Sequence, residues 1–147
     1  MLKLATTLIA FVFVGAGIGT GIPWQTPPAP AKPTIPADTI SMPNPVKPNK
    51  ESIDRAKKVY KIDCEMCHGE DGTGKTDLAK SLGYNLVDYT KPETLQKKTD
   101  GELYWIIKNG YGNMPAEGNR AKDDDEWNLV IYLRSFSDPS ILPAAKK

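Results

Sequence analysis

The chain has 147 residues, which allows one domain of ordinary size with appended segments and leaves no room for a large catalytic domain. From Glu51 to Lys147 it carries fifteen Lys or Arg and seventeen Asp or Glu, although the net charge of the whole chain is +1. This balance argues against nucleic-acid binding, which usually requires a strongly basic stripe. Nine of the thirteen prolines lie in residues 23–48, so composition divides the chain just before Asn49.

Residues 1–22 are typical of an export signal. Lys3 is followed by a long apolar run, and the next charged residue is Lys32. The positive start and short apolar core are those of a signal peptide that is cleaved near Ala16. The uncharged run to Ile22 is also close to the ~20 residues that cross a bilayer, so an uncleaved N-terminal membrane anchor is an equal alternative.

Residues 23–48 form a Pro-rich linker. Frequent proline fixes φ, removes hydrogen-bond donors and favours the polyproline II conformation, whose rise of about 3.1 Å per residue gives a fully extended reach of roughly 80 Å. We therefore expect a semi-rigid tether that is not packed into the domain. Because a tether has a purpose only when its far end is held, the linker slightly favours the membrane anchor.

The compact domain is expected to span residues 49–139, with a loose tail at 140–147. Its first predicted helix is capped by the side chain of Asn49. Four apolar residues then recur at helical spacing before the two cysteines of the chain. They are Ile53, Ala56, Val59 and Tyr60. The sequence therefore predicts an apolar stripe directly before these cysteines.

Cys64 and Cys67 are separated by two residues and followed at once by His68, which is the attachment pattern of a c-type haem. On a helix the two thiols share a face and can each add across a vinyl group of one porphyrin, while the imidazole of His68 can ligate the iron. A structural zinc site needs four ligands, and the chain has no further Cys or His. A thioredoxin-like dithiol would need strands around the motif, and a simple disulfide would leave His68 unexplained. The pattern predicts one covalently attached haem c.

A second helix is predicted from the capping box Thr99-Asp100-Gly101-Glu102. Leu103, Ile106 and Ile107 are expected to face the core, and Asn109-Gly110 ends the helix.

A loop with a candidate iron ligand follows this helix. Met114 is the only methionine after the cysteine motif, and no second histidine is available. Its thioether is therefore predicted as the second axial ligand, on the iron face opposite His68, which favours ferrous iron. Gly112 permits close approach of the loop, and Pro115 stiffens it. The alternative is a gap-filling core methionine.

The final predicted helix starts at Asp123, with Glu126 at its third position and an acidic first turn that complements the helix dipole. Apolar residues cover most of its circumference: Trp127, Leu129, Val130, Ile131, Tyr132, Leu133 and Phe136. A helix of this kind must contact two partners, and the first helix and the haem region are the obvious ones.

The stretch from about Asn49 to Phe136 resembles a class I monohaem cytochrome c domain. The residues that carry the resemblance are the Cys64–His68 motif, the Gly-rich loop after it, Asn113-Met114-Pro115 and the closing Tyr132-Leu133-Arg134. The resemblance implies a small all-α cytochrome c fold, in which the N- and C-terminal helices cross and helices and loops wrap one haem.

Two structural details also follow from the resemblance. Ala56 and Tyr60 are expected to meet the region from Leu129 to Leu133. Many relatives place a proline shortly after the Gly-rich loop, where this chain has Thr76 and Asp77. The partner of the other ring nitrogen of His68 is therefore open.

The implied function is electron transfer by reversible Fe(II)/Fe(III) cycling, without bond-making on a substrate. The expected protein is not an enzyme; it is an electron carrier, which can also serve as a subunit or partner of an oxidoreductase. It is expected to act with redox partner proteins on the periplasmic side of a bacterial-type membrane, tethered there or soluble after cleavage near Ala16. The alternative is a haem subunit or peroxidase-like enzyme in which Met114 dissociates to open a site.

Overall fold

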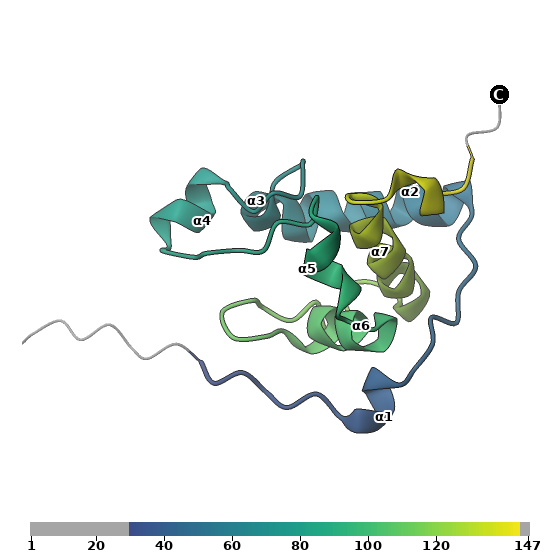
Figure 1. Cartoon of the computed structure of the whole chain (residues 1–147), viewed down its shortest axis with the longest axis horizontal. Helices are drawn as coiled ribbons and strands as arrows, with labels where there is room; N and C mark the ends of the chain where they lie inside the picture. Colours follow the sequence, from purple (N-terminus) through teal and green to yellow (C-terminus); the bar gives the residue numbers. More distant parts are fainter. Residues whose placement is uncertain (1–29, 145–147) are drawn as a thin grey trace, which may run out of the picture.

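The computed structural model describes residues 30–144, and within this range the chain is helical and forms no strand (Figure 1). The predicted all-α fold is confirmed. The predicted signal or anchor at residues 1–22 lies outside the described residues. The elements, in chain order, are α1 (Ala37–Ile40), α2 (Lys50–Val59), the π-helical turn η1 (Tyr60–Cys64), α3 (Glu65–His68), α4 (Asp77–Ser81), α5 (Pro92–Gln96), α6 (Asp100–Asn109), α7 (Asp123–Ser135) and the 3₁₀ turn η2 (Pro139–Ile141).

Helix α2 begins where the sequence predicts. The side chain of Asn49 accepts a hydrogen bond from the backbone N–H of Ser52, and the Ser52 hydroxyl accepts one from the Asn49 N–H at 2.9 Å. The same hydroxyl lies 2.9 Å from the side-chain oxygen of Asn128 on α7. The cap of the first long helix therefore also contacts the last one.

Helices α2 and α7 cross and form the centre of the core, as the first and last helices were expected to do (Figure 1). Ala56 and Val130 are fully buried, and Leu129 is 1% exposed. The small side chain of Ala56 lets the two backbones approach, and the ring of Tyr60 meets that of Tyr132 edge-on at 5.4 Å between centroids. The predicted contact of Ala56 and Tyr60 with the Leu129–Leu133 region is confirmed.

Helix α6 packs beside α7, and its N-terminus is capped by the predicted capping box. The Thr99 side chain accepts a hydrogen bond from Glu102 N–H, and the Glu102 carboxylate accepts one from Thr99 N–H. Arg134 of α7 holds this end of α6 by contacting Asp100 at 2.7 Å and donating to the carbonyl of Lys98 at 2.7 Å.

The acidic start of α7 differs from the expectation. Lys122 occupies the N-cap position without a side-chain cap, so Glu126 is the fourth helical residue and not the third. Glu126 is fully buried. The buried Asp125 forms an ion pair with Arg55 of α2, with 2.7 Å between Nε of the arginine and the carboxylate oxygen. The acidic run therefore holds neighbouring helices in addition to complementing the helix dipole.

The Pro-rich segment also differs from the expected free tether. The segment from residue 30 to α1 runs below α6, and the segment after α1 returns along the side of the domain to the start of α2 (Figure 1). The helical turn α1 packs against α6. Thr99 donates a hydrogen bond to the carbonyl of Ile40 at 2.7 Å, and Asn44 donates one to the carbonyl of Trp127 at 3.1 Å. No helix within residues 30–144 has the length and apolar character needed to cross a bilayer.

Because Leu129 is buried where α2 and α7 cross, shortening its side chain should destabilise the protein. Leu129→Ala removes a side chain that is 1% exposed and should lower the free energy of unfolding by ~2–5 kcal/mol, measured by denaturant titration. Leu82→Ala is the matched control, because Leu82 is 49% exposed, and should change stability by less than about 0.5 kcal/mol. Equal losses in the two variants would contradict the packing described here.

Candidate functional site

An apolar cavity lies next to the crossing of α2 and α7, with about 370 Å³ of empty space when its mouth is included. Three of the four predicted site residues, Cys64, His68 and Met114, line it together. Cys67 lies on the same helical turn as His68, is partly buried and is not part of the lining. The other lining residues are aromatic or aliphatic: Tyr60, Tyr89, Leu103, Ile106, Ile107, Leu129 and Leu133.

A π-helical turn places the cysteine motif against this cavity. Helix α2 passes into η1 at Tyr60, and α3 then carries Cys67 and His68 and ends at Gly69, whose φ is +82°. Each residue added to a helical turn rotates the following side chains by about 100°, so η1 changes the face on which the motif lies. The Tyr60 hydroxyl donates a hydrogen bond to the Gly69 carbonyl at 2.6 Å and closes this turn onto α2.

His68 is buried and available as a ligand. Its ring stacks on that of Tyr89, with 5.0 Å between centroids and 19° between planes. Nδ1 is buried and has no hydrogen-bond partner among residues 30–144. Burial lowers the pKa of His68, so the imidazole is neutral and keeps a nitrogen lone pair for a metal ion. A buried, neutral and incompletely paired imidazole fits an iron-binding role.

Thr76 stands near the place where the resemblance leads us to expect a proline, and it makes a different contact. Its hydroxyl donates a hydrogen bond to the carbonyl of Cys67 at 3.0 Å and accepts one from Ala79 N–H, which caps α4. Thr76 therefore fixes the last turn of the cysteine motif and does not pair with Nδ1 of His68.

The Cys64 thiol is not suited to dithiol redox chemistry. Burial raises the pKa of Cys64 to about 12, so the thiol stays protonated at neutral pH. The nucleophile in thiol–disulfide exchange is the thiolate, which a low pKa favours. This environment argues against the redox dithiol alternative.

Met114 is held by a tight loop after α6. Tyr111 and Met114 exchange two backbone hydrogen bonds, with N–O distances of 3.0 and 3.1 Å. Gly110 has a φ of +77°, and a Cβ there would lie 2.6 Å from the carbonyl oxygen of Met114. Only glycine fits this position without displacing the backbone of Met114.

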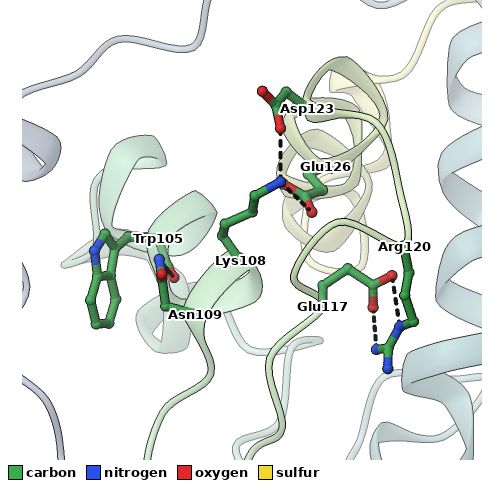
Figure 2. Close-up of polar contacts among 7 residues, drawn as sticks. All are labelled: Trp105, Lys108, Asn109, Glu117, Arg120, Asp123 and Glu126. Carbon is green, nitrogen blue, oxygen red and sulfur yellow. Dashed lines mark hydrogen bonds and ion pairs between the residues drawn. The ribbon is translucent and has the colours of Figure 1, made fainter.

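Two ion-pair clusters hold the chain that leaves this loop, and sequence reasoning did not identify them (Figure 2). In the first, Arg120 contacts the buried carboxylate of Glu117 at 2.7 Å and lies 3.5 Å from Asp63. Asp63 precedes Cys64 directly. One guanidinium therefore contacts both the segment after Met114 and the segment that begins the cysteine motif.

The second cluster joins the end of α6 to the start of α7. The ammonium of Lys108 lies 2.8 Å from Asp123 and 3.3 Å from a carboxylate oxygen of Glu126, as Figure 2 shows. Burial raises the pKa of Glu126, although the hydrogen bond from Lys108 acts in the opposite direction. Because a buried carboxylate needs its cation, Lys108 fixes both ends of the Met114 loop region. The sequence signal for this cluster is the acidic run at 123–126, which by itself predicts only a helix cap.

Several known proteins with similar sequences are cytochromes c6. Cytochrome c6 of Leptolyngbya boryana is 29% identical over 76 residues, which cover 52% of this chain and 82% of that protein. Cytochrome c6 of Pyropia tenera is 26% identical over 93 residues, which cover 58% of this chain and 94% of that protein.

A solved structure supports the same fold. A chain of the reducing HAO-like protein complex of Kuenenia stuttgartiensis matches 71% of this chain with a TM-score of 0.54 and 24% identity. The match covers 50% of that chain, so this protein spans half the length of that neighbour.

The family model described as cytochrome c oxidase, cbb3-type, subunit III, matches residues 51–133. This range contains the cysteine motif, the Met114 loop and nearly all of both crossing helices. The chain therefore belongs to this family and is a c-type cytochrome domain with one covalently attached haem c.

Proposed function

We propose that the protein is an exported monohaem electron carrier with His68 and Met114 as the axial ligands of the haem iron. Cys64 and Cys67 hold the haem through thioether bonds. The observation that carries this proposal is that Cys64, His68 and Met114, from two distant parts of the chain, line one apolar cavity. The haem supplies one-electron cycling between Fe(II) and Fe(III).

The segment around His68 is fixed from both sides, which suits an attachment site. Thr76 binds the carbonyl of the residue before His68, and Tyr60 binds the carbonyl of the residue after it. Such contacts orient a ligand and limit the reorganisation that accompanies a change in iron charge. The protein's contribution to electron transfer is this rigid, water-poor surrounding.

The described cavity favours a carrier over the peroxidase-like alternative. Its lining contains no carboxylate, Lys or Arg among residues 30–144 that could act as a distal acid or base. Burial raises the pKa of both lining tyrosines, Tyr60 and Tyr89, so both stay neutral. The tight Tyr111–Met114 pairing also supports a ligand that stays in place.

The proposed location and partners follow from the sequence and one surface feature. Residues 1–22 direct export to the periplasmic side of a bacterial-type membrane and either stay as an anchor or are cleaved near Ala16. Ile62 and Met66 flank Cys64 and are 72% and 66% exposed. They give donor and acceptor proteins an apolar contact near the haem attachment.

Met114→Ala tests the axial ligand. The haem should become high-spin or open to external ligands, and the reduction potential should fall by an amount on the order of 100 mV, because a thioether stabilises Fe(II). The measurement is the absorption spectrum of both oxidation states together with a redox titration.

Met66→Ala is the matched control, since Met66 is 66% exposed and outside the cavity lining. It should leave the spectrum and the potential unchanged. An unchanged spectrum in Met114→Ala would eliminate Met114 as the ligand.

Removal of the attachment thiols tests the covalent bonds. Wild-type protein from cells competent in c-type maturation should keep its haem through denaturing acid–solvent extraction, and its intact mass should include one haem. Cys64→Ala with Cys67→Ala should lose all haem in the same extraction. Retention of haem in the double variant would contradict attachment at these two residues.

Arg120→Gln tests the link between the two ligand segments. It leaves the buried carboxylate of Glu117 without its cation and should lower the free energy of unfolding only modestly, because the arginine is 56% exposed. Denaturant titration of the haem-loaded protein measures this. Lys122→Gln is the matched control, because it removes an exposed cation close to Arg120 in the sequence. An equal loss of stability in Lys122→Gln would show that the Arg120 contacts do not stabilise the fold.

A further inference from the structure

A segment that precedes the haem domain is docked along α6. We call residues 32–47 the strap. At its centre, α1 lies on Gly101, which is buried inside α6. A Cβ at Gly101 would overlap the carbonyl oxygen of Thr39 and would lie 3.1 Å from that of Met42. Glycine destabilises a helix by about 1 kcal/mol relative to alanine. Here the absence of a side chain at Gly101 leaves the notch that receives α1.

Hydrogen bonds hold the strap on either side of this notch. The Thr99 hydroxyl donates to the carbonyl of Ile40 at 2.7 Å. Asn44 donates to the carbonyl of Trp127 at 3.1 Å, and the Trp127 ring stacks on Tyr104 of α6 at 4.1 Å. The strap is therefore joined to both α6 and α7.

The N-terminal end of the strap reaches the Met114 loop. The ammonium of Lys32 lies 5.7 Å from the centroid of the Tyr111 ring, within cation–π range. Its side chain also lies 4.0 Å from the position of a Cβ on Gly112. Tyr111 in turn exchanges two backbone hydrogen bonds with Met114. Contact is thus continuous from Lys32 through Tyr111 to the backbone of Met114.

We propose that the strap is a positioning element that keeps Met114 on the haem iron. This inference rests on the proposed His68 and Met114 ligation. Departure of the methionine from the iron is easier when the Tyr111–Met114 loop can move away from the haem, and a docked Lys32 opposes that motion. Prolines on both sides of α1 (Pro33, Pro36, Pro43) restrict the free strap, so less conformational entropy is lost when it docks.

Imidazole binding to the ferric, haem-loaded protein measures how easily Met114 leaves the iron. Lys32→Ala removes the contact with Tyr111 and should raise the apparent imidazole affinity by about two- to fivefold, the size of an exposed cation–π contact. Lys47→Ala is the matched control, because Lys47 is an exposed lysine of the same strap. It should leave the affinity unchanged.

Gly101→Ala tests the notch itself. Alanine is the better helix former, so α6 should be retained while α1 is displaced. Hydrogen exchange of the strap amides should accelerate, and the imidazole affinity should rise at least as much as in Lys32→Ala. An imidazole affinity that stays at the wild-type value in both variants would overturn the proposal.

Met114→Ala separates this proposal from the ligand assignment. With no methionine to displace, imidazole should bind Met114→Ala much more tightly, and adding Lys32→Ala or Gly101→Ala should cause no further change. A further increase in these double variants would show that the strap acts on access to the haem and would overturn its role on Met114. If Met114→Ala alone leaves the imidazole affinity unchanged, the His68 and Met114 ligation fails, and the role of the strap fails with it.

Discussion

The haem site depends on the crossing of α2 and α7. The close approach at Ala56 places Tyr60 and the end of α2 against Leu129 and Leu133, and the cavity forms where these side chains leave space beside the crossing. The cysteine motif is the direct continuation of α2, and the Met114 loop joins α6 to α7. The same helix contact therefore sets the positions of both segments that we propose to ligate the haem iron.

Most of the fold could be predicted because its signals are local. Asn49 and the Thr99–Glu102 box mark the starts of α2 and α6, and the apolar circumference of α7 requires two packing partners. The candidate ligands were found because they are rare, with one histidine in the chain and one methionine after it. Their presence in one cavity required the structure, since no spacing rule relates His68 to Met114.

The features that the sequence did not reveal are tertiary. The π-helical turn at Tyr60–Cys64 interrupts the regular helical spacing, and the contacts of Arg120 join segments that are far apart in the sequence. The frequent prolines of residues 23–48 predict a restricted backbone, but they give no information on the surface that receives residues 30–48. That surface exists because Gly101 lacks a side chain.

We propose that Met114 supplies sulfur to the iron of a haem held by the Cys64–His68 motif. X-ray absorption at the iron edge of the wild-type protein tests this ligation most directly, since it reports the elements bound to iron. We expect a sulfur ligand in both oxidation states, which disappears in Met114→Ala and persists in Met66→Ala. An iron bound by nitrogen alone in the wild-type protein, or a sulfur ligand that survives Met114→Ala, would contradict it.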